Sequence, residues 1–169
     1  MNRIILIALF IGLPVITSTG CKNYSFTGAS VSPEVKTVSI AYFPNRASLI
    51  QPSLSQSFTE KLRDKFTSQT NLILKDGEAD LIFEGHISDY QTQPTAIQGN
   101  DNAALNRLTI SVMVKFINTK DPKQDFETLF SRFADYSASQ NFASVEQDLI
   151  NQISAQLVDD IFNRAMVNW

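Results

Sequence analysis

Apolar and polar residues alternate most regularly between Leu108 and Asn118. This period of two predicts a strand with one buried face. Shorter or less regular runs of the same kind predict four further strands, at Val35–Phe43, Leu72–Leu74, Leu81–Thr92 and Phe126–Ser137. A turn predicted at Asn118–Pro122 makes the last two strands a hairpin.

Two other segments repeat apolar residues every three to four positions, which predicts amphipathic helices. The first begins at Pro52–Ser53, and the second is capped by Ser144 and reaches about Val167. Each predicted cap has a glutamine three residues later, as in a capping box. The apolar stripes consist of Leu54, Phe58, Leu62 and Phe66 in the first helix and of Val145, Leu149, Ile153, Leu157, Ile161 and Phe162 in the second.

The predicted order of elements is β-α-β-β-β-β-α. Because each helix has one apolar face, both should pack on one face of the sheet, which gives an α+β sandwich. We expect a mixed sheet of about four to five strands. The first strand-helix-strand unit should be a right-handed crossover with parallel strands, and the later hairpins should be antiparallel. No repeat or heptad pattern is present, so residues 35–169 should form a single domain.

The N-terminus has the pattern of a secretory signal. Arg3 precedes an apolar run of about 13 residues, Ile4–Ile16, which is shorter than the roughly 20 residues of a membrane-spanning helix. Ser18-Thr19-Gly20 then precedes Cys21, the only cysteine. This arrangement resembles a bacterial lipobox, although Ser18 stands where that motif prefers leucine. An ordinary signal peptide with a leftover cysteine is the alternative, and a transmembrane anchor is a weaker one.

We therefore expect residues 1–20 to be a removed signal peptide, Cys21 to carry a covalent diacylglycerol and acyl lipid, and residues 21–34 to be a tether. A thiolate is nucleophilic enough to take the lipid, and each buried methylene contributes about 0.8 kcal/mol to the anchor. Lys22 follows the cysteine. By resemblance to other lipoproteins, the absence of aspartate there indicates the periplasmic face of the outer membrane.

Charge and composition exclude several function classes. Once Arg3 leaves with the signal, 13 basic residues stand against 17 acidic ones. A basic nucleic-acid footprint is therefore absent. Lipidation of Cys21 leaves no thiol for disulfides, zinc or catalysis. Eleven phenylalanines remain after the signal, and they should supply much of the core.

No catalytic motif is present: the chain lacks GxSxG, HExxH, CxxC, Walker and GxGxxG sequences. The one histidine, His86, alternates with Glu84 and Ser88 on a predicted strand, so a half-exposed strand histidine is favoured over a catalytic base. The same alternation predicts that Glu84 and Asp89 point to opposite faces and form no carboxylate pair. We expect neither an enzyme nor a metal or cofactor beyond the lipid on Cys21.

Several segments in order resemble the LptE family of lipopolysaccharide-assembly lipoproteins. The resemblance covers about residues 21–169 and keeps the order of elements. The ordered series together with the lipobox carries the resemblance. The segments are Tyr24–Gly28, Val35–Ile40, Phe43–Asn45, Leu62–Phe66, Gly85–Tyr90, Pro94–Gly99, Asn106–Ile110 and Ile161–Ala165.

This resemblance implies an outer-membrane lipoprotein that binds and plugs the β-barrel LptD. It would help the barrel assemble and assist delivery of lipopolysaccharide to the outer leaflet, and members of the family are described as binding lipopolysaccharide itself. The main alternative is a lipid-anchored periplasmic adaptor or binding module of another envelope transport or secretion complex. A secreted enzyme is a remote third reading.

Two sets of residues are candidates for these contacts. The predicted loop Gln93–Arg107 is long and polar, and long loops are often functional. It would contact the barrel through Gln98, Asn100, Asn102 and Asn106, unless it is merely solvated.

Contact with lipid A phosphates would need cations. Arg107, Lys115 and Arg132 are the candidates. Arg107 and Lys115 should lie on one side of their strand, opposite Leu108 and Val112, and Arg132 should lie on the partner strand. Three ordinary exposed cations are the alternative.

Deletion of Ala96–Ala104 should weaken co-purification with a barrel partner, because it removes most of the polar loop. Affinity purification of the tagged protein, with the barrel quantified in the eluate, measures this. Unchanged co-purification would show that the loop is only a solvated connection.

Overall fold

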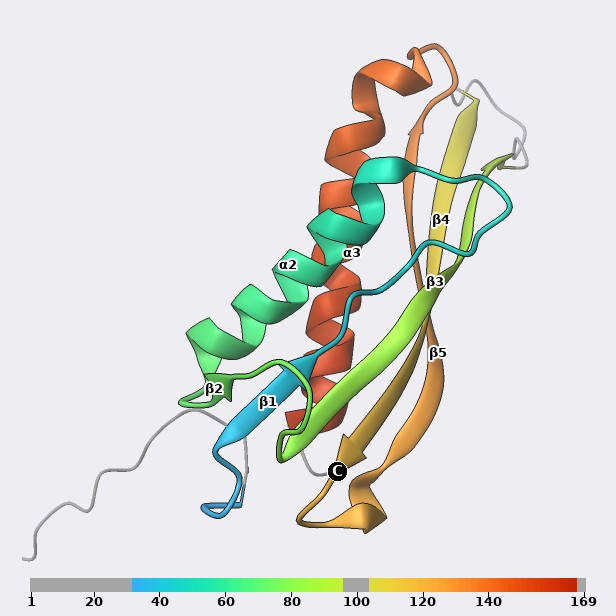
Figure 1. Ribbon diagram of the computed structural model, residues 1–169. Helices are drawn as coiled ribbons and strands as arrows, with labels where there is room; N and C mark the ends of the chain where they lie inside the picture. The colour runs from blue at the N-terminus through green and yellow to red at the C-terminus, as the bar shows by residue number, and fades with distance from the viewer. Residues whose placement is uncertain (1–31, 96–103, 167–169) are drawn as a thin grey trace, which may run out of the picture.

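A computed structural model describes residues 32–95 and 104–166. The signal peptide, Cys21 and most of the tether lie outside the described residues. The described residues form five strands, two long helices and one short 3-10 helix (Figure 1). In chain order these are β1 Thr37–Ile40, α2 Pro52–Gln69, β2 Ile73–Leu74, β3 Leu81–Pro94, β4 Leu105–Asn118, η1 Pro122–Gln124, β5 Phe126–Ser137 and α3 Phe142–Met166.

The five strands form one mixed sheet in the order β2-β1-β3-β4-β5. β1 is parallel to both β2 and β3, whereas β3, β4 and β5 are antiparallel neighbours. Figure 1 shows α2 and α3 on the same side of this sheet. The predicted α+β architecture, with two helices on one face of a mixed sheet, is confirmed.

The core lies between the helices and that sheet face. The even-numbered residues of β4 from Leu108 to Phe116 are fully or almost fully buried, as are Leu54, Phe58, Leu62 and Phe66 of α2. A continuous series of aromatic rings crosses this layer, with neighbouring centroids 4.7–5.1 Å apart. In order across the layer, the rings belong to Phe162, Phe66, Phe83, Phe116 and Phe126.

Strand ends differ from the predicted ones. The β3–β4 hairpin extends through Pro94 and Leu105, so the predicted loop Gln93–Arg107 was too long. Gln93 pairs with Arg107 and Pro94 with Asn106, and the Thr95 N–H donates to the Leu105 carbonyl at 2.8 Å. β1 is shorter than predicted. The Ala41 N–H still donates to the Phe83 carbonyl at 2.9 Å, but the Phe43 N–H donates to the Thr59 hydroxyl of α2 at 3.1 Å instead of to β3. The chain nevertheless stays beside β3, where the Arg46 N–H donates to the Ile87 carbonyl at 2.8 Å.

Both predicted helix caps were wrong by a few residues. The N-cap of α2 is Gln51, because Pro52 takes the first helical position, where its missing N–H costs nothing. α3 begins at Phe142 rather than after Ser144. The Asn141 side chain accepts a hydrogen bond from the Ala143 N–H at 3.0 Å, in keeping with the strong preference for asparagine at helix starts.

One carboxylate joins three elements near the starts of the two helices. Glu146 of α3 accepts a hydrogen bond from the Tyr90 hydroxyl of β3 at 2.6 Å and from the Gln51 amide at 3.1 Å. Burial, followed by the hydrogen bond to Glu146, raises the pKa of Tyr90. The phenol therefore stays protonated and remains a donor.

A register shift between Ile87 and Asp89 interrupts the β3–β4 ladder. The extra residue, Ser88, reverses the alternation that follows it. Three residues of β3 pair with odd-numbered residues of β4 and therefore lie on the sheet face opposite the helices. They are Glu84, His86 and Asp89. The prediction that Glu84 and Asp89 point to opposite faces was therefore wrong, because an inserted residue is invisible to a strict period of two.

Gly85 is required by close packing on the buried face of β3. A Cβ built at this position would lie 2.1 Å from the Met113 carbonyl oxygen and 2.6 Å from Cε1 of Phe43. The Phe43 ring is fully buried and packs edge-to-face on Phe58, with centroids 5.4 Å apart. The glycine thus lets the chain between β1 and α2 close onto the sheet.

Gly85→Ala should lower the free energy of unfolding by about 3 kcal/mol or more, because backbone cannot move aside as a flexible side chain can. Gly77→Ala is the matched control. Gly77 has a φ of 83° and no atom within 4 Å of a built Cβ, so it should lose only about 1–2 kcal/mol through backbone strain. Urea unfolding of both variants checks this, and equal losses would contradict the steric account.

Candidate functional site: the open face of the sheet

The sheet face opposite the helices carries two of the candidate residues, Arg107 and Lys115. It consists of odd-numbered residues of β4 and β5 and the β3 residues paired with them. Leu129 and Phe133 are 53% and 48% exposed. Ser131 and its partner Ser111 lie between these two apolar side chains, and Thr109 lies opposite Phe133. This surface, which we call the open face, is therefore mostly polar with an apolar centre on β5.

Arg107 is held in place at one end of the open face. Its guanidinium makes two hydrogen bonds to Asp135 of β5, at 2.7 and 2.9 Å, and lies 3.6 Å from the centroid of the Phe133 ring. This hydrogen bonding lowers the pKa of Asp135 and raises the pKa of Arg107. An incoming phosphate would have to compete with a carboxylate that is already bound.

Lys115 lies toward the other end of the open face. The register places it between Glu84 of β3 and Glu127 of β5. Eight residues separate it from Arg107, which corresponds to about 27 Å along a strand. The prediction that Arg107 and Lys115 share a face is confirmed, but they cannot contact one phosphate.

The open face is not positive overall. Arg107 and Lys115 are its two cations, and four carboxylates lie on the same face. These belong to Glu84, Asp89, Glu127 and Asp135.

Arg132 lies on the other side of the sheet. It pairs in register with Ile110, a core residue, and its guanidinium binds both carboxylate oxygens of Asp160 in α3, one of them at 2.7 Å. That hydrogen bond raises the pKa of Arg132. The three cations therefore form no common cluster. The hairpin register, which pairs Arg132 with the even-numbered residue Ile110, separates it from Arg107 and Lys115.

The predicted partner-binding residues are described only in part. Asn106 is half-buried within β4, paired with Pro94 and Tyr136, rather than in a loop. Gln98, Asn100 and Asn102 lie outside the described residues, as does the lipidation site Cys21. Their roles stay predictions, as do the phosphate contacts of the three cations.

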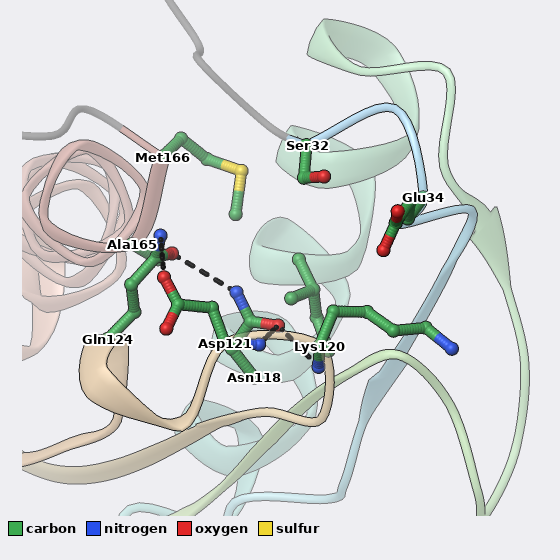
Figure 2. Close-up of a pocket in the computed structure, with 9 residues that line it drawn as sticks. Ser32, Glu34, Asn118, Lys120, Asp121, Gln124, Ala165 and Met166 are labelled. Carbon is green, nitrogen blue, oxygen red and sulfur yellow. Dashed lines mark hydrogen bonds between the residues drawn. The ribbon is translucent and has the colours of Figure 1, made fainter.

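A small cavity of about 270 Å³ lies between the β4–β5 turn, the end of α3 and the segment before β1 (Figure 2). Ser32, Met166 and side chains of that turn line it. The polar side chains of that turn bond one another: the Asn118 amide donates to Gln124 at 3.1 Å, and the Gln124 amide donates to Asp121 at 3.1 Å. These groups close the turn, and we assign no ligand to the cavity.

Asp80 fastens the strand ends beside this cavity. Its carboxylate accepts hydrogen bonds from the Lys36 and Thr37 N–H groups at 2.9 and 3.0 Å and lies 3.2 Å from Nζ of Lys120. The backbone hydrogen bond from Lys36, followed by that from the Thr37 hydroxyl, holds the pKa of Asp80 far below its ordinary value of 3.8. The negative charge at Asp80 therefore stabilises the folded state.

In residues 32–95 and 104–166, no three His, Cys, Asp or Glu side chains are grouped as a metal site would require. No helix in the same ranges is both long and apolar enough to cross a membrane. His86 lies on the open face opposite Met113.

Known proteins resemble this chain at two levels. The family described as "LptE: Lipopolysaccharide-assembly" matches residues 35–165. No curated protein matches the sequence. The structure of a minor lipoprotein from Acinetobacter baumannii is similar, with a TM-score of 0.51 and 12% identity over 77% of this chain and 91% of that one. A hypothetical protein from Chlamydia trachomatis has a TM-score of 0.52 and 13% identity over 79% and 99%. At such identities these two structures show the fold alone.

Asp80→Asn should lower the melting temperature at pH 7, because it removes a charge that the fold stabilises. A group with a lowered pKa contributes stability above its unfolded-state pKa and loses it as the pH falls. The difference between wild type and variant should therefore narrow below about pH 4. Thermal melts from pH 7 to pH 2 check this, and a difference independent of pH would contradict the assignment to the carboxylate.

Proposed function

Because this chain belongs to the LptE family of lipopolysaccharide-assembly proteins, we propose that it binds and plugs an LptD-type β-barrel in the outer membrane. In this role it assists delivery of lipopolysaccharide to the outer leaflet. The observation that carries the proposal is the extent of the family match. Residues 35–165 include every strand of the described residues, all of α2 and all of α3 except Met166, so the proposal concerns the whole domain rather than a shared fragment.

The physics of the domain is compatible with a plug. The lumen of a large β-barrel is polar, so a plug needs a rigid interior and an exterior that forms hydrogen bonds. The series of phenylalanine rings in the core supplies the rigid interior. The open face supplies the second, because its serine, threonine and glutamine side chains offer donors and acceptors, while Arg107 is already neutralised by Asp135. A plug with paired charges avoids burying isolated ones.

A lipid anchor at Cys21 would keep the domain at the periplasmic side of the barrel. Residues 21–34 form the proposed tether, which spans at most about 50 Å when fully extended. This is enough to reach a barrel opening from the surface of the membrane that holds the lipid.

Direct contact with lipopolysaccharide is a further part of this proposal. Arg107 and Lys115 would contact phosphates at two separate points of the open face. Arg132 would contact one only from the helix side. At each point the phosphate would have to compete with neighbouring carboxylates for the cation. Binding by these residues would therefore depend on local geometry rather than on net charge.

The test is affinity purification of the tagged full-length lipoprotein from detergent-solubilised outer membranes, with mass spectrometry of the co-purified proteins. We expect one large β-barrel in near-stoichiometric amount, retained in high salt, because a plug buries a large interface that salt does not screen. The same tag on another outer-membrane lipoprotein is the control.

The identity of the co-purified protein decides the outcome. An inner-membrane transporter or a periplasmic secretion component in place of the barrel would support an adaptor function instead. Absence of any stoichiometric partner would overturn the proposal of a plug, and only the family membership and the fold would stand.

A further inference from the structure

The two edges of the sheet are very different. β2 forms one edge and has two residues, whereas β5 forms the other and has twelve. β5 pairs with β4 through twelve consecutive residue pairs without a register shift. One side of β5 is thus paired with β4 along its whole length, and the other side is the edge of the sheet.

The backbone groups that point outward from β5 can be identified. The Ala138 N–H donates to the Ala104 carbonyl at 2.8 Å, so even-numbered residues in this register bond toward β4. In an antiparallel ladder the alternate residues then direct their N–H and C=O groups away from the partner. These residues are Glu127, Leu129, Ser131, Phe133 and Asp135. Among residues 32–95 and 104–166, no group bonds their backbone N–H or C=O on the outward side.

Edges of this length are usually protected. Natural sheets use proline, lysine, bulges or very short strands to prevent edge pairing. β5, with the sequence FETLFSRFADYS, contains no proline, glycine or lysine, and its ladder has no bulge. β2 is protected by its shortness, whereas β5 is protected only by its charged side chains, Glu127, Arg132 and Asp135.

The side chains beside the free edge have a defined pattern. Leu129 and Phe133 are exposed and lie on either side of Ser131, while Glu127 and Asp135 lie at the two ends. A second copy of β5 paired antiparallel about Ser131 would place Leu129 opposite Phe133, which is favourable. It would also place Glu127 opposite Asp135 twice. Arg107 already binds Asp135, which weakens this repulsion, but two acidic side chains opposite one another still disfavour the pairing. Charge therefore favours a different strand over self-pairing.

We propose that the outer edge of β5 binds an extended segment of a partner protein as a sixth, antiparallel strand. The segment carries apolar residues opposite Phe133 and Leu129, a small polar residue opposite Ser131, and basic residues opposite Asp135 and Glu127. The main-chain hydrogen bonds supply affinity, and the alternate side chains supply selectivity. This inference goes beyond the proposed function, because it follows from the strand edge and does not depend on the barrel.

The probe is the nonapeptide Lys-Thr-Leu-Thr-Thr-Thr-Phe-Thr-Lys, labelled with a fluorophore and titrated with the full-length lipoprotein in detergent. We expect saturable binding by fluorescence anisotropy. N-methylation of the amides at the third, fifth and seventh positions should abolish it, because those amides face β5. N-methylation at the fourth and sixth positions should leave it unchanged. This comparison alters the peptide only and needs no change in the protein.

Ser131→Pro is the variant that targets the edge. Proline removes the outward N–H of Ser131 but no bond of the β4–β5 ladder. Ser131→Ala is the matched control: both variants lose the hydrogen bond between the Ser111 and Ser131 hydroxyls, 2.9 Å long, but alanine keeps the N–H. Binding should weaken about tenfold or more in Ser131→Pro and remain within about twofold in Ser131→Ala.

Three results would overturn the proposal. The first is the absence of saturable binding. The second is equal binding of the two N-methylated peptides. The third is slow hydrogen exchange of the Leu129, Ser131 and Phe133 amides in the free full-length protein, which would mean that another segment of this chain or a second copy already covers the edge. Concentration-dependent sedimentation would then identify a second copy as the occupant.

Discussion

The fold depends on the apolar contact between two helices and one face of the five-stranded sheet. With no disulfide in the described domain, burial of this layer is the main source of stability. The aromatic series from Phe162 to Phe126 runs through α3, α2, β3, β4 and β5 in turn, so each element is held by rings from its neighbours. Gly85 belongs to the same constraint, because the sheet can approach Phe43 only where no side chain intervenes.

Covering one face leaves the other open, and this asymmetry governs the rest of the molecule. Polar residues on the open face do not weaken the core, so that face is free to carry function. Its cations are nevertheless balanced by carboxylates, most clearly in the Arg107–Asp135 pair with Phe133 beneath the guanidinium. A surface of this kind suits a polar protein wall better than it suits capture of anions by charge alone.

The same asymmetry explains how the sheet can interact along its edges. α3 and α2 cover the sheet from one side and leave the outward backbone groups of β5 without partners in the described part of the chain. A regular edge of this length is an aggregation hazard unless it has an occupant. The negative side chains at both ends of the edge, Glu127 and Asp135, reduce pairing between copies while remaining compatible with a basic partner strand.

The sequence by itself determined the class of fold, the two amphipathic helices and the order of elements, because local periodicity reports which side chains are buried. It also placed Arg107 and Lys115 on one face, since both lie on one uninterrupted strand. Positions that depend on other parts of the chain were decided only by the tertiary structure. The bulge at Ser88 moved Asp89 onto the face of Glu84, and the hairpin register moved Arg132 to the helix side, beside Asp160. Alternation along one strand carries no information about an inserted residue or about the register of its neighbour, and both arise when strands align to bury their apolar faces together.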